Sequence, residues 1–124
     1  MNHKVNKVLN QVALDNDHRY KMASAIVHKA NILAVGISQY KTHPMMNTKW
    51  GFKEEQIYLH AEVDAIRNAL RTFNKDIMYK FDLYVWRVKQ IEGEWVTGLA
   101  KPCLGCQHMI EDFAFKNVYY SKDF

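Results

Sequence analysis

Features that mark membrane, secreted and nucleic-acid-binding chains are scarce in this sequence. No purely apolar run is longer than four residues, whereas a membrane-spanning helix needs about 20. The first residues, Met1-Asn2-His3-Lys4, lack the apolar stretch of a secretory signal. No block of five like charges occurs, although the net charge is +4, so the excess of basic residues is scattered. We therefore expect a cytoplasmic protein without a membrane span.

The overall composition is that of an ordinary globular domain. Apolar residues make up 48% of the chain and charged residues 24%, which excludes disordered, collagen-like and low-complexity chains. A length of 124 residues predicts a single domain, because a domain usually takes roughly 100–200 residues. The scattered positive charge favours an anionic small-molecule ligand and makes a nucleic-acid partner the less favoured alternative.

Cysteine is nearly absent, and its placement is informative. The only two cysteines are Cys103 and Cys106. Structural disulfides are rare in the reducing compartment expected here. A spacing of three residues therefore favours a metal site or a redox pair over a structural crosslink.

Apolar periodicity predicts strands that alternate with helices, which is the pattern of an α/β fold. Turn-forming residues separate the elements, and neither an internal repeat nor a linker is visible. Residues 40–50 show no periodicity and predict a loop. The expected helices cover residues 4–14, 60–72 and 102–115, and the expected strands cover 21–28, 32–39, 81–90, 95–97 and 118–120.

Two short motifs combine the residue types of a zinc site. One imidazole, His60, and two thiolates, Cys103 and Cys106, are suitable ligands for zinc. The cysteines share one face if they lie in the first helical turn after Pro102, where the helix N-terminus also favours thiolates. His60 and Glu62 can serve one site only if a helix begins there. The spacing therefore predicts two helix N-termini directed at one metal.

Three protein ligands are typical of a catalytic zinc, because a structural site is usually closed by four. Glu62, next to such a site, has the chemistry of a proton shuttle. Two alternatives stay open at this point. In the first, Cys103 and Cys106 form a redox pair, although a thioredoxin-like context near the N-terminus is absent. In the second, His43 or His108 is the fourth ligand of a closed structural zinc site.

Together, His-x-Glu and the later Pro-Cys-x-x-Cys resemble the signature of the zinc-dependent cytidine and deoxycytidylate deaminase superfamily. The resemblance covers most of the chain, including the strand pair at 25–38, HAEVDAIRNAL at 60–70, and the helix and strand at 101–115 and 117–120. It implies an α-β-α sandwich in which helices flank a mixed sheet of about four to five strands. A histidine as first ligand is typical of deoxycytidylate, tRNA adenosine and polynucleotide deaminases.

The resemblance also implies roles for individual residues. Glu62 would take a proton from the zinc-bound water and pass it to the ring nitrogen and the leaving amine. Three further residues would contact the substrate, with Ser38 standing where the family usually has asparagine for the sugar. The implied Zn²⁺ ligands are His60, Cys103 and Cys106, and the implied substrate contacts are Ser38, the Ala61 amide and the Lys101 carbonyl.

The resemblance favours hydrolytic deamination of a cytosine nucleotide or nucleoside, with dCMP to dUMP as the favoured reaction. One alternative is deamination of cytosine or adenine in single-stranded DNA or RNA, with Trp50, Trp86 and Trp95 as stacking surfaces. The tryptophans would otherwise form a buried core in an extra hairpin at about 86–98. A second alternative is nucleotide binding without turnover. The last strand, 118–120, is expected at an open sheet edge, which predicts a homo-oligomer.

Overall fold

A computed structural model describes residues 2–17, 21–38, 60–101 and 104–123. The loop expected at 40–50 and the predicted first helical residue, Pro102, lie outside these residues. Within them, no helix combines the length and the apolar character that crossing a membrane requires.

Each predicted helix and strand is present, with bounds that differ by a few residues. The prediction missed one short element, the 3₁₀ helix η2, which is too short to show an apolar period. The elements in chain order are α1 (His3–Leu14), β1 (Lys21–His28), β2 (Asn31–Ile37), α2 (Ala61–Ala69), η2 (Lys75–Lys80), β3 (Asp82–Ile91), β4 (Glu94–Gly98), α3 (Leu104–Phe113) and β5 (Asn117–Tyr120).

The five strands form one mixed sheet, as expected. The order is β2-β1-β3-β4, and β5 also pairs with β3. The first half of β3, from Asp82 to Val85, pairs with β5 in parallel, and the second half, from Arg87 to Ile91, pairs with β4 in antiparallel fashion. Strand β1 occupies the other side of β3. The end of β4 and the end of β5 therefore meet beside the middle of β3.

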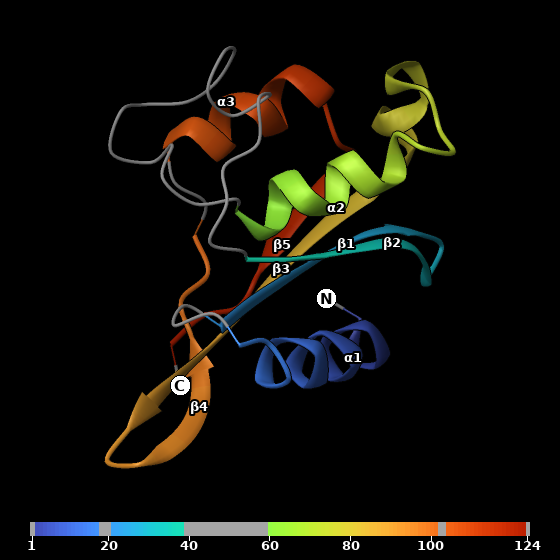
Figure 1. Cartoon of the computed structure of the whole chain (residues 1–124). Helices are drawn as coiled ribbons and strands as arrows, with labels where there is room; N and C mark the ends of the chain where they lie inside the picture. Colours follow the sequence, from blue (N-terminus) through green and yellow to red (C-terminus); the bar gives the residue numbers. More distant parts are fainter. Residues whose placement is uncertain (1, 18–20, 39–59, 102–103, 124) are drawn as a thin grey trace.

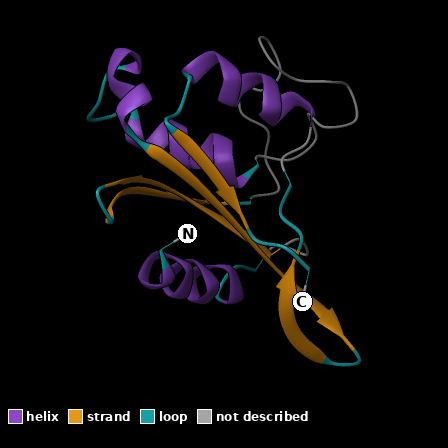
Figure 2. Cartoon of the chain, turned by 180° about the vertical axis from the view of Figure 1, so that it is seen from behind, coloured by secondary structure: helices purple, strands orange, loops and turns teal. Residues whose placement is uncertain are grey.

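Helices cover both faces of the sheet, which confirms the predicted α-β-α sandwich. Helix α1 lies on one face, and α2 and α3 lie on the other (Figures 1 and 2). Successive side chains of a strand point to opposite faces. In β3, Leu83 and Val85 accordingly join the core under α2 and α3, while Tyr84 and Val88 join the core under α1. Two separate apolar cores thus share one central sheet.

The extra hairpin is present, but its tryptophans do not form the buried core that was one of the two expectations. Strands β3 and β4 continue beyond the helix-covered part of the sheet (Figures 1 and 2). The side chain of Trp95 is 44% exposed, and the Lys21 ammonium lies 5.3 Å from its ring centroid. Trp86 instead faces α1, where its indole N–H donates to the Asn10 side chain at 3.0 Å. The homo-oligomer expected from the β5 edge stays a prediction.

Candidate active site

The helix α2 begins where the proposed site requires. His60 is its N-cap residue, with an extended backbone (φ −76°, ψ 151°). Its carbonyl accepts the first helical hydrogen bond from the Asp64 N–H at 3.1 Å. Glu62 therefore lies in the first turn, where the helix dipole favours a carboxylate. This placement confirms the inference that His60 and Glu62 share a helix start.

Helix α2 approaches strand β2 so closely that only glycine fits at the contact. A Cβ atom added to Gly36 would lie 2.1 Å from the Ala65 backbone nitrogen and 2.4 Å from the Ala61 carbonyl oxygen. Both distances are far inside van der Waals contact. The missing side chain of Gly36 thus fixes the N-terminal half of α2 against the end of β2.

Side chains of α2 also bond the backbone of β2. The buried Asp64 carboxylate accepts the Ile37 N–H at 3.0 Å and a bond from the Arg67 guanidinium at 2.6 Å. One turn later, the Asn68 amide donates to the Val35 carbonyl at 2.8 Å. Because β2 is at the edge of the sheet, these two residues hold backbone groups that another strand would otherwise pair with.

The N-terminal parts of α2 and α3 meet through two of the predicted zinc ligands. The Cys106 sulfur lies 3.2 Å from His60 Nδ1. Ligands of one tetrahedral zinc, with Zn–N of about 2.0–2.1 Å and Zn–S of about 2.3 Å, lie about 3.6 Å apart. A soft and a borderline donor at this separation fit the ion. Cys103 lies outside the described residues, and within these residues no group of three potential metal-binding side chains is found.

The remaining residues of the His-Ala-Glu motif are deeply buried at the same place. Glu62 is 2% exposed and Ala61 is 1% exposed. Ala61 is the first residue of α2, so its N–H is among those that cannot bond within the helix. The structure thus brings together His60, Ala61, Glu62 and Cys106. Two metal-binding side chains next to a backbone N–H and a carboxylate suit a small polar ligand held against a metal.

The other two predicted substrate contacts lie on the segments that flank this centre. Ser38 follows directly after β2 and is 6% exposed. Its hydroxyl accepts the Met22 N–H at 3.2 Å and a bond from the Asn16 amide at 3.3 Å. Lys101 is exposed and follows directly after the buried Ala100. The roles of Ser38 toward a sugar and of Lys101 toward an amine stay predictions.

Two cavities in the described part of the chain are lined by residues other than His60 and Glu62. One, of about 440 Å³, is lined by His28, Tyr79, Lys80 and Lys116. Another, of about 190 Å³, is a groove between α3 and β5 that Lys101 and Glu111 border. Of these two cavities, the second is lined by a predicted site residue, Lys101, and the first is not.

Sequence reasoning missed the residues that hold α2 in place. Asp64 and Asn68 are one helical turn apart on a helix whose other residues are mostly apolar and buried. A carboxylate and an amide at that spacing give a recognisable signal, because buried polar side chains require partners. Their partners on β2 have no sequence signal, since pairing between distant segments depends on the tertiary fold.

The sequence comparison decides the family. Residues 2–122 match the family described as the cytidine and deoxycytidylate deaminase zinc-binding region. The chain belongs to this family. The resemblance inferred from the two motifs is thereby confirmed, and the deaminase family accounts for paired helix N-termini that carry histidine, glutamate and cysteine. No curated protein sequence matches the chain at a significant level.

Solved deaminase structures share the fold of this family member. A dCMP deaminase of cyanophage S-TIM5, in complex with dCMP and dUMP, superposes with a TM-score of 0.62 at 21% identity, over 95% of this chain and 78% of that one. Its apo form gives 0.60 at 22%, over 97% and 84%. A guanine deaminase of Bacillus subtilis gives 0.56 at 25%, over 98% of this chain and 65% of its own. The chain thus spans less than two thirds of the guanine deaminase.

Proposed function

We propose that this chain is a zinc-dependent hydrolytic deaminase of a cytosine nucleotide or nucleoside, with dCMP to dUMP as the favoured reaction. One observation carries the proposal. The His60 ring and the Cys106 sulfur meet at 3.2 Å where α2 and α3 begin, and Glu62 is buried in the first turn of α2. Cys103, three residues before Cys106, completes the proposed ligand set.

The ligand set fits a zinc ion that, when bound, supplies an activated water by lowering its pKa toward ~7. Glu62 is the group of this chain that moves protons. It accepts one proton from the attacking water and delivers it to the ring nitrogen, and it then takes the second proton from the hydroxyl on the ring carbon and delivers it to the departing amine. The water oxygen bonds to the ring carbon, the carbon–nitrogen bond breaks, and ammonia leaves.

Three further groups orient the base and the sugar in this proposal. The Ala61 N–H, at the start of α2, donates to the ring carbonyl, and the Lys101 carbonyl accepts from the leaving amine. Ser38 lies two residues beyond Gly36 and so borders the same end of α2. A cytosine nucleotide is also the ligand class of the cyanophage enzyme, which was solved with dCMP and dUMP.

The two tryptophans that the structure describes, Trp86 and Trp95, give little support to a polynucleotide substrate, and Trp50 lies outside the described residues. The indole of Trp86 is turned to the α1 face by its bond to Asn10, which is the face opposite α2 and α3. Trp95 lies on the projecting hairpin beside Lys21. Base stacking in a groove requires aromatic faces near the reacting centre. Deamination of an oligonucleotide is therefore the less favoured function, and the substrate assay below includes it as an alternative outcome.

The test of the substrate is ammonia release from dCMP, CMP, cytidine, deoxycytidine, guanine and a cytosine-containing oligonucleotide. Zinc content is measured on the same preparation, and one ion per chain is expected. Preferred turnover of dCMP supports the proposal, and preferred turnover of the oligonucleotide or guanine replaces its substrate. A chain that binds nucleotides but releases no ammonia is a binding protein.

The test of the mechanism is Glu62→Gln, which keeps the size of the side chain but removes the base. General acid–base catalysis is typically worth 10²–10⁴-fold, and two proton transfers pass through this one group. Turnover should fall at least about a thousandfold, while the zinc content and the unfolding midpoint stay unchanged. The matched control is Glu111→Gln, an exposed position on α3. Near-normal turnover by Glu62→Gln contradicts the role assigned to Glu62.

A further inference from the structure

Ser121, directly after β5, bonds to two segments of the chain, strand β3 and residues 98–100. Its N–H donates to the Val85 carbonyl at 2.9 Å, and its carbonyl accepts the Ala100 N–H at 2.9 Å. Its hydroxyl donates to the Gly98 carbonyl at 2.7 Å and accepts the Arg87 N–H at 3.0 Å. The residue is 2% exposed. One buried serine therefore joins β3 to the end of β4 and to the residues that follow it.

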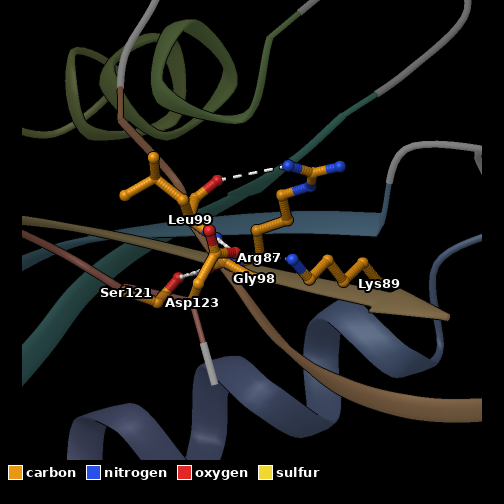
Figure 3. Close-up of polar contacts among 6 residues, drawn as sticks. All are labelled: Arg87, Lys89, Gly98, Leu99, Ser121 and Asp123. Atoms are coloured by element: carbon orange, nitrogen blue, oxygen red, sulfur yellow. Dashed lines mark hydrogen bonds and ion pairs between the residues drawn. The ribbon is translucent and has the colours of Figure 1, made fainter. Parts of the chain in front are cut away.

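Asp123 continues this attachment two residues later (Figure 3). Its carboxylate accepts the Leu99 N–H at 3.0 Å and forms an ion pair with Lys89 at 2.6 Å. The Arg87 guanidinium donates to the Leu99 carbonyl at 3.4 Å. Gly98, Leu99 and Ala100 thus each carry a backbone group that is bonded to Ser121 or Asp123. We call Ser121 and Asp123 together the C-terminal clasp.

Gly98 brings this segment close to β3. A Cβ atom at Gly98 would lie 3.2 Å from Lys89 Cδ and 3.3 Å from Arg87 Cδ, so glycine leaves room for both side chains to cross the strand end. The Gly98 carbonyl also accepts the hydrogen bond from the Ser121 hydroxyl. The segment is therefore fixed both by a close approach and by hydrogen bonds, before the chain turns toward α3.

The residues held by the clasp lead directly into the second motif. Lys101 follows Ala100, and Cys103 comes two residues later. One residue spans at most about 3.6 Å, so a displacement of Ala100 is carried directly to the Lys101 carbonyl. We propose that Ser121 is a positioning residue that sets the Lys101 carbonyl and the approach to Cys103. This inference rests on the proposed function, which gives those two groups their roles.

The mechanism is indirect, because the Ser121 hydroxyl bonds backbone groups of Gly98 and Arg87. Partners bonded directly to a metal ligand typically change metal affinity or activity by about 10–100-fold when they are removed, and Ser121, which acts through the backbone, should act at the lower end of that range. Loss of the serine hydroxyl should therefore weaken zinc binding and turnover together. A role limited to stability predicts an effect on unfolding alone.

The experiment compares Ser121→Ala with Ser24→Ala. Ser24 is also fully buried in the sheet, and its hydroxyl also donates to a strand carbonyl, that of Tyr84, at 2.7 Å. Among the described residues, its hydroxyl bonds to Tyr84 and not to the clasp or to the segment from Gly98 to Lys101. Both variants are assayed at a temperature at which both are fully folded, by chelator competition for zinc and by dCMP turnover per bound zinc.

For Ser121→Ala, we expect the zinc dissociation constant to rise about tenfold and kcat to fall about tenfold or more. Ser24→Ala should leave both quantities within about twofold, and Ser121→Thr, which retains the hydroxyl, should recover part of the loss. Equal zinc affinity and equal turnover of the two alanine variants overturn the positioning role. Failure of the proposed function is a separate result, because it shows in the wild-type chain as absent zinc or absent ammonia release.

If the wild-type chain binds zinc but turns over none of the substrates, the chelator competition for zinc is the only test of the positioning role of Ser121. An unchanged zinc affinity in Ser121→Ala then overturns the inference, and a weakened affinity supports it. If the wild-type chain binds no zinc, the positioning role falls together with the proposed function.

Discussion

The two halves of the proposed site are attached to the sheet in different ways. The half that carries His60 and Glu62 is the start of α2, which lies against Gly36 at a distance that excludes a single added carbon atom. The half that carries Lys101 follows β4 and is held through hydrogen bonds by the C-terminal clasp. Packing determines the first position, and directional bonds from later residues determine the second.

The difference predicts different sensitivities. A close-packed contact resists any increase in volume, because neither backbone can move without disturbing the core. A hydrogen-bonded segment that loses one bond can shift while the chain stays folded, so the loss of stability is smaller. Substitutions at the first attachment should therefore act mainly on folding. Substitutions at the second should act mainly on the geometry of the site.

Gly36→Ala should have the largest effect on stability. The new methyl group would overlap the backbone of α2 at Ala65 and Ala61, and overpacking costs about 1–3 kcal/mol, or more where the backbone must shift. We expect a loss at or above ~3 kcal/mol in the free energy of unfolding by urea. The control is Gly93→Ala, where φ is +84° and no atom lies within 4 Å. It should lose only ~1–2 kcal/mol, the cost of an L side chain at positive φ, and equal losses would contradict the close-packing account.

Asp64→Ala should have the next largest effect. It leaves the Ile37 N–H and the Arg67 guanidinium without the carboxylate that they share. Removing one member of a buried ion pair costs about 3–5 kcal/mol, and because the Arg67 side chain is 25% exposed we expect about 2–3 kcal/mol. Asp64→Asn keeps an acceptor for Ile37 and should lose less.

The control for Asp64→Ala is Asn68→Ala, one turn further from the start of α2. It removes a single neutral bond to the Val35 carbonyl, so we expect a loss of about 1 kcal/mol in the same urea titration. If Asn68→Ala destabilises the chain as much as Asp64→Ala does, the carboxylate adds nothing beyond one ordinary hydrogen bond. The attachment of α2 would then owe no more to Asp64 than to Asn68.

Asp123→Asn should have the smallest effect, and one that depends on pH. The hydrogen bond from Lys89 and then that from the Leu99 N–H hold the pKa of Asp123 below its ordinary value of 3.8. The stabilisation by the carboxylate is therefore complete above pH 3.8 and is lost as the pH falls through the lower pKa of the folded chain. Asparagine can still accept from Leu99 but carries no charge.

The measurement is the difference in thermal midpoint between the wild type and Asp123→Asn. It should be small at pH 7, should decrease as the pH is lowered below 3.8, and should also decrease in 1 M salt, which screens exposed charges. Because the side chain is exposed, solvent already weakens the pair. A difference that grows on acidification would contradict the lowered pKa.

The sequence predicted the helix start at residue 60 for a physical reason. His60 and Glu62 are two residues apart and would diverge in the middle of a helix, so a shared site required the helix to begin between them. The structure confirms this with an extended backbone at His60. The α-β-α sandwich was predicted as well, but from the family resemblance, and the two apolar faces of β3 show why helices cover both sides of the sheet.

The attachments themselves were not predictable from the sequence. Ser121 is 23 residues from Gly98 and 34 from Arg87, and an isolated serine after a strand has no periodic pattern. Its role arises only because β4 and β5 end at the same place beside β3. The roles of Ser38 and Lys101 came from the family resemblance and stay predictions, since local sequence does not determine what a backbone carbonyl or a hydroxyl binds.

The side chains that fix α2 also have a consequence for how the chain behaves in crowded solution. An edge strand with open backbone groups can recruit a strand from another molecule, which is a common first step of aggregation. On β2, the Ile37 N–H and the Val35 carbonyl are already bound by Asp64 and Asn68. An incoming strand would have to displace a buried carboxylate and an amide before it gained any bond there. The same contacts that orient the helix thus protect this edge of the sheet from self-association.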